Sequence, residues 1–163
     1  MGIFPTTILL AIDDSEEAEL AAMKAVDLAE STDSELYVVH VGLAPNFLVE
    51  GNPDYSCKLY EEIEQESQEL LRKLTWRVKA TGGNVAGSYL RMGEVHLEIV
   101  SVARELEANL IVMGCRGRSR IRRAIEGSVS DAVIRHAPCP VLVVPSHESA
   151  EIPERVTHLG EGR

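Results

Sequence analysis

Short runs of apolar residues alternate along the chain with segments in which apolar residues recur at helical spacing. Four of the runs are almost continuously apolar and predict strands, over residues 7–12, 35–41, 110–113 and 141–144. The first of them suits a strand that is buried on both faces of a parallel sheet. A fifth run, residues 85–91, has mixed polarity and predicts a strand at the edge of the sheet.

The segments between these runs predict helices that each bury one apolar face. One helix follows Ser15, one spans residues 56–81, one follows Glu94 and one follows Ser128. Ser15 or Asp14 can cap the first helix. Residues 42–55 contain two prolines and two glycines, and they predict a loop long enough to form a flap over a binding site.

Strands that alternate with helices predict parallel βαβ units with right-handed crossovers. We therefore expect an α/β fold, with an open, Rossmann-like five-stranded parallel sheet and helices on both faces. One domain over residues 1–145 accounts for all these elements. Residues 146–163 lack periodicity and predict a flexible C-terminal tail. In such sheets ligands bind beyond the carboxyl ends of the strands, at the topological switch point.

The composition excludes several classes of partner. The 163 residues include 16 basic and 26 acidic side chains, which give a net charge of -10. This balance argues against binding to nucleic acid, and also against binding to anionic membranes. No apolar run approaches the roughly 20 residues that span a bilayer. Three cysteines without C-x-x-C spacing predict free thiols and a cytoplasmic location.

Glycines are concentrated after the strand at residues 110–113, where Gly114, Gly117 and Gly127 precede the last predicted helix. A strand, a glycine-rich loop and a helix N-terminus form an arrangement that binds phosphates through backbone N–H groups and the helix dipole. Five arginines between residues 116 and 123 add positive charge to this stretch of an acidic protein. They are either solvated loop residues or phosphate contacts. Cys115, beside Arg116, is either a packing residue of this loop or a redox-sensitive thiol.

The spacing of Gly114, Gly117, Gly127 and Ser128 resembles the nucleotide-binding signature of the universal stress proteins. A first strand that ends at an aspartate and the terminal sequence CPVLVVP strengthen the resemblance, which covers residues 7–145. The resemblance implies the strand order 3-2-1-4-5. It also implies a homodimer formed through the strand Val141–Val144, and binding of ATP, or of ADP or AMP.

The same resemblance implies which residues contact the nucleotide, from the ends of the first, second and fourth strands and from the glycine-rich loop. They are Ala11, Asp13, Ser15, Val41, Met113, Gly114, Arg116, Gly117, Arg118, Gly127, Ser128, Val129 and Ser130. Asp14 departs from the family, which most often has a small residue at this position. An added carboxylate beside a polyphosphate calls for a divalent cation, so Asp14 is either a partner of Mg²⁺ bound through the phosphates or a simple helix cap.

Three functions remain open from these residues. The first is a nucleotide-dependent stress-response regulator or binding module, the second a slow ATPase or nucleotidyl-transfer enzyme, and the third a dimeric scaffold without a nucleotide. Asp14 and Ser15 are weak candidates for catalysis, and the sequence has no Walker A lysine, so binding without efficient turnover is favoured. His40 is expected to be a buried core residue, and His136 to complement the C-terminal dipole of the last helix.

Overall fold

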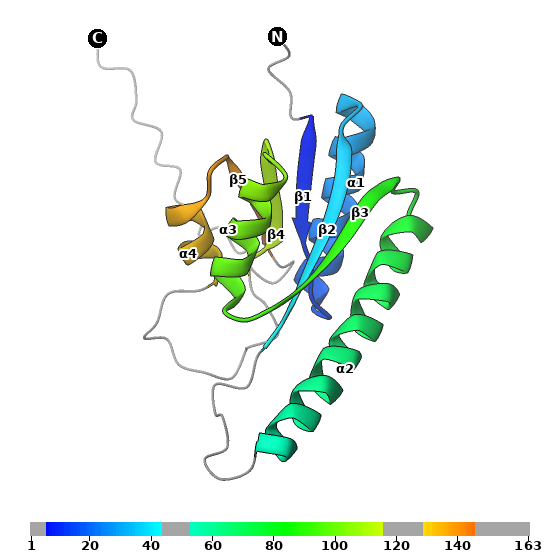
Figure 1. The fold of residues 1–163 in the computed structure, drawn as a ribbon. Coiled ribbons are helices and arrows are strands. Elements are labelled where there is room, and N and C mark those ends of the chain that lie inside the picture. The colour runs from blue at the N-terminus through cyan, green and yellow to red at the C-terminus, as the bar shows by residue number, and fades with distance from the viewer. Residues whose placement is uncertain (1–5, 44–52, 116–128, 146–163) are drawn as a thin grey trace, which may run out of the picture.

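The computed structural model describes residues 6–43, 53–115 and 129–145. Five strands form one parallel sheet in the order β3-β2-β1-β4-β5, which confirms the predicted fold class and strand order (Figure 1). The strands are β1 (Thr7–Ala11), β2 (Glu35–Gly42), β3 (Val85–Met92), β4 (Leu110–Gly114) and β5 (Val141–Val144). The helices are α1 (Glu16–Thr32), α2 (Pro53–Ala80), α3 (Val95–Glu105) and α4 (Val129–His136).

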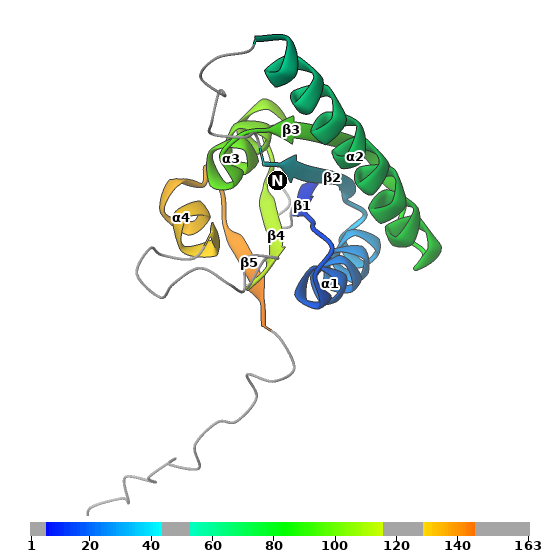
Figure 2. The same ribbon diagram turned by 90° about the horizontal axis from the view of Figure 1, so that it is seen from below.

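The sheet separates two apolar cores. Viewed from below, α1 and α2 lie on one side of the sheet, and α3 and α4 lie on the other (Figure 2). Side chains alternate between these cores along β1, β2 and β4, as the period of a β-strand requires. In β1, Ile8 and Leu10 pack against α1 and α2, while Leu9 and Ala11 face α3 and α4.

The register of the strands aligns their carboxyl ends around β1. Ala11, the last residue of β1, pairs with Val39 on one side and with Met113 on the other. The chain continues from β1 into α1 on one face of the sheet, whereas the helix that follows β4 lies on the opposite face. The edge between β1 and β4 is therefore the topological switch point, where open α/β sheets bind their ligands.

Most predicted boundaries agree with the structure to within a residue or two, but the loop assigned to residues 42–55 ends too late. Helix α2 begins at Pro53 and not at residue 56, because proline lacks an N–H that the first helical turn would leave unpaired in any case. Residues 44–52 of the predicted flap lie outside the described residues, as does the predicted tail. The edge position of β3 is confirmed.

His40 is a core residue, as predicted: it is 7% exposed, and its Nδ1 lies 3.0 Å from the carbonyl oxygen of Ile12. The cysteines Cys57, Cys115 and Cys139 are all free. In the described part of the chain, no helix combines the length and the apolar character needed to cross a membrane.

Candidate functional site

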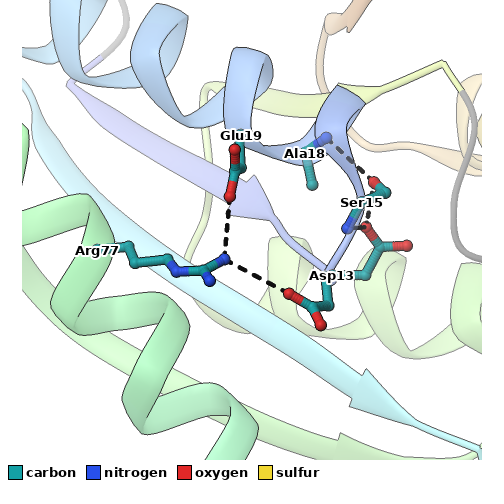
Figure 3. Close-up of polar contacts among 6 residues, drawn as sticks. Asp13, Ser15, Ala18, Glu19 and Arg77 are labelled. Carbon is teal, nitrogen blue, oxygen red and sulfur yellow. Dashed lines mark hydrogen bonds and ion pairs between the residues drawn. The ribbon is translucent and has the colours of Figure 1, made fainter.

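The turn that follows β1 is held by side chains that also cap α1. The backbone N–H of Ser15 donates to Asp13 Oδ1 at 3.1 Å, and the Ser15 hydroxyl donates to the same oxygen (Figure 3). The Ser15 hydroxyl oxygen in turn accepts from the N–H of Ala18 at 3.1 Å, which makes Ser15 the N-cap of the helix. One carboxylate at the switch point is thus fixed in position by the first turn of α1.

Asp14 points toward α2. Its Oδ1 lies 3.4 Å from Nη1 of Arg77. The same nitrogen lies 3.0 Å from Glu19 Oε1, so one arginine of α2 joins Asp14 to the first turn of α1 (Figure 3). Ser15, and not Asp14, is the cap of the helix. Because all three side chains are substantially exposed, these ion pairs contribute at most about 1 kcal/mol each to stability.

Gly114, at the carboxyl end of β4, touches the backbone of α1. A Cβ atom at this position would lie 2.8 Å from Glu17 Cβ and 2.9 Å from the Glu17 carbonyl carbon. Glu17 itself is only 6% exposed, whereas its acidic neighbours Glu16 and Glu19 are exposed. Its position one turn before Ala21 places it on the buried face of the helix, and this spacing is the signal for its burial in the sequence.

Four of the residues predicted to contact the nucleotide share the α3 and α4 face of the sheet. Ala11 and Met113 are buried there as register partners, and Val41 and Val129 are partly buried against the same core. Ser130 is 6% exposed, and its hydroxyl donates to the carbonyl oxygen of Cys115 at 3.4 Å. The structure therefore brings Ala11 together with Met113, Asp13 with Ser15, and Ser130 with the residue that follows Gly114.

The remaining predicted contacts, Arg116, Gly117, Arg118, Gly127 and Ser128, lie outside the described residues. The backbone of Cys115, which leads into this segment, is held to the end of β5 by an N–H···O bond of 2.9 Å to Val144. Across the described ranges, no group of three or more His, Cys, Asp or Glu side chains is placed to hold a metal ion.

The geometry supplies hydrogen-bonding groups at the switch point but uses most of them within the fold. The Ser15 hydroxyl donates a hydrogen bond to Asp13 and accepts one from the N–H of Ala18. Asp14 is paired with Arg77. A hydroxyl engaged in this way is poorly placed to activate a water molecule. The arrangement suits the positioning of a bound ligand better than proton transfer.

Comparison with known proteins identifies relatives across nearly the whole chain. The model of the universal stress protein family matches residues 5–145. A protein of Staphylococcus haemolyticus that carries the universal stress protein name is 36% identical over 148 residues, covering 90% of this chain and 87% of its own length.

Solved structures show the same fold. The universal stress protein UspA from Lactobacillus plantarum superposes with a TM-score of 0.72 at 24% identity, covering 88% of this chain and 99% of its own. A universal stress protein from Archaeoglobus fulgidus, in complex with dAMP, gives a TM-score of 0.58 at 24% identity, again covering 88% and 99%.

Proposed function

Because the chain belongs to the universal stress protein family, we propose that it binds an adenine nucleotide, ATP or the related ADP or AMP, and acts as a nucleotide-dependent stress-response regulator in the cytoplasm. The observation that carries this proposal is the meeting of β1 and β4 at the switch point. There the carboxylate of Asp13 and the paired residues Ala11 and Met113 stand next to the start of the glycine-rich segment.

The chemistry at this edge suits a nucleotide. Val41, which is only partly buried, offers an apolar surface for a base or a ribose, and a carboxylate accepts hydrogen bonds from hydroxyl or amino groups. The glycines at positions 117 and 127 add backbone N–H groups that can approach phosphates closely. The dAMP complex of the Archaeoglobus fulgidus protein supports an adenine nucleotide as the class of ligand.

We propose binding without efficient turnover. The two side chains that could orient a water molecule, Asp14 and Ser15, are engaged by Arg77 and by the helix cap, respectively. A slow ATPase would still release ADP and phosphate over hours, so ADP formation in a mixture of protein, ATP and Mg²⁺ separates the two functions.

The test of binding is isothermal titration of the full chain with ATP, ADP, AMP and cyclic AMP, each with and without Mg²⁺. We expect the wild-type protein to bind at least one of them, and Gly127→Val to weaken that binding strongly. If the wild type binds none of them, or if Gly127→Val binds equally well, a scaffold without a nucleotide becomes the better description.

Asp13→Asn isolates the role of the carboxylate. Asparagine retains an oxygen for the two hydrogen bonds from Ser15, so the helix cap persists, while the negative charge and the second oxygen are lost. If Asp13 contacts the nucleotide, we expect about a tenfold or larger loss of affinity, which corresponds to one charged hydrogen bond. Asp14→Asn is the matched control: it should leave binding without Mg²⁺ unchanged, and it should reduce the Mg²⁺-dependent part only if Asp14 supports the cation.

We further propose that the protein is a homodimer formed through β5. This strand is at an edge of the sheet, and Leu142 is 37% exposed on it. An apolar edge strand of this kind is stabilised when a partner covers it.

A further inference from the structure

Two histidines from different helices face each other on the side of the sheet that carries α3 and α4. His96 lies in the first turn of α3, and His136 is the last residue of α4. The centroids of their rings are 6.0 Å apart, and the ring planes are inclined by 41°. Both side chains reach solvent, since His136 is exposed and the His96 side chain is 22% exposed.

Each ring has its Nδ1 atom close to an oxygen atom. His136 Nδ1 lies 2.8 Å from the carbonyl oxygen of Ala132, and His96 Nδ1 lies 3.2 Å from Glu94 Oε1. The Nδ1 atom of His136 therefore carries the proton in the neutral ring, which leaves a lone pair on its Nε2. A histidine that donates one ring N–H to a carboxylate or a backbone carbonyl, with the other nitrogen open, has the arrangement typical of a metal ligand.

The Glu94 carboxylate can act as a partner of His96 because it does not cap α3, the helix that it precedes. Glu94 occupies the N-cap position of α3, yet its side chain makes no capping hydrogen bond. Its carboxylate instead lies beside His96, with Oε1 3.2 Å from Nδ1.

The separation of the rings suits a shared ion. A ligand nitrogen about 2.1 Å from the metal places each ring centroid about 3.2 Å from it, so a tetrahedral angle sets the centroids about 5.2 Å apart. The observed 6.0 Å exceeds this value by less than 1 Å. Small side-chain rotations at a solvent-accessible position close that difference.

We propose that His96 and His136 form a two-nitrogen site for a divalent transition-metal ion of the Zn²⁺, Ni²⁺ and Cu²⁺ class, which imidazole ligands prefer. The described residues provide no third side-chain ligand, so water completes the coordination shell. An ion held in this way joins the start of α3 to the end of α4. The site uses none of the proposed nucleotide contacts, so the two proposals stand or fall separately.

Imidazole-selective NMR of the full chain, free of nucleotide and titrated with Zn²⁺ alone, tests the site. We expect the signals of His96 and His136 to respond together, at the same Zn²⁺ concentration and with one ion per chain. Either His96→Gln or His136→Gln should abolish the response of the remaining histidine in that concentration range. Glu94→Gln should weaken the affinity by roughly 10-fold or more, the usual effect of losing an outer partner of a metal ligand.

The control variant is His147→Gln combined with His158→Gln, which removes the two C-terminal histidines and should leave the paired response intact. The proposal is overturned if His96 and His136 respond at different Zn²⁺ concentrations, or if His136 responds normally in His96→Gln. Either result means that the rings only stack against each other, a contact for which 6.0 Å is also suitable.

Discussion

Replacement of Gly114 by alanine tests how closely α1 packs on the end of β4. The added Cβ would lie 2.8 Å from Glu17 Cβ and 2.9 Å from the Glu17 carbonyl carbon. Carbon atoms in contact prefer separations of about 3.5–4.0 Å, so the helix must move by roughly 0.7 Å or the strand end must shift. The obstacle is partly backbone, and a rotamer change in Glu17 therefore cannot relieve it.

The expected loss of stability follows from this overlap. Overpacking of this kind costs about 1–3 kcal/mol. Alanine recovers part of that, because replacing glycine within a strand stabilises it by about 0.5–1 kcal/mol. The midpoints of these two ranges leave a net loss of about 1 kcal/mol. For a chain of this length each kcal/mol lowers Tm by about 2–4 °C, so Tm should fall by about 2–4 °C.

Gly87→Ala is the matched control, since Gly87 also lies within a strand. Its added Cβ would meet Tyr37 Cδ1 at 3.1 Å, and Tyr37 is a partly exposed side chain that can move away. Both variants are compared with the wild type by calorimetry and by urea unfolding in the absence of nucleotide. A Gly114→Ala protein as stable as the wild type, or one no less stable than Gly87→Ala, would refute the close helix–strand contact.

Three further predictions concern other parts of the fold. Ser15→Ala removes the N-cap of α1 and should lower the free energy of unfolding by about 1 kcal/mol in urea titrations, whereas Ser31→Ala, near the end of the same helix, should have little effect. Leu142→Glu puts a charge on the exposed face of β5 and should convert a dimer into a monomer in light scattering; an unchanged mass would place any dimer contact elsewhere. Burial raises the pKa of the Cys139 thiol, so iodoacetamide near neutral pH should modify Cys139 more slowly than the exposed Cys57, and equal rates by mass spectrometry would contradict this.

The architecture follows closely from the sequence because each element satisfies its own local pattern. The continuous apolar runs identified β1, β2, β4 and β5, and the mixed run at residues 85–91 identified β3 and its position at an edge of the sheet. Helix α2 shows where such patterns stop being informative. Its apolar stripe runs along the whole helix, but Leu71, Leu74 and Val78 are buried while Leu59 and Ile63 are only partly so. Periodicity defines a face of a helix, whereas the length of sheet available to cover it is a property of the assembled fold.

The candidate site was less predictable for a similar reason. The sequence places Asp13 and Gly114 at strand ends, and the structure shows that these ends meet at the switch point. It could not show that Ser15 is committed to capping, because a serine after an aspartate suits both a cap and a ligand contact. The pairing of Arg77 with Asp14 joins residues far apart in the chain, and no local pattern encodes such a contact.

The alanines on the buried face of α1 also bear on the entropy of folding. The helix packs on the sheet through Ala18, Ala21, Ala22, Ala25 and Ala29, together with Val26. Alanine has no side-chain rotamers to lose, so this interface forms without the conformational entropy loss that accompanies burial of longer side chains. The same small side chains allow the helix backbone to approach the sheet closely. Any larger residue on this face would both restore the entropic penalty and push α1 away from the residues at the switch point.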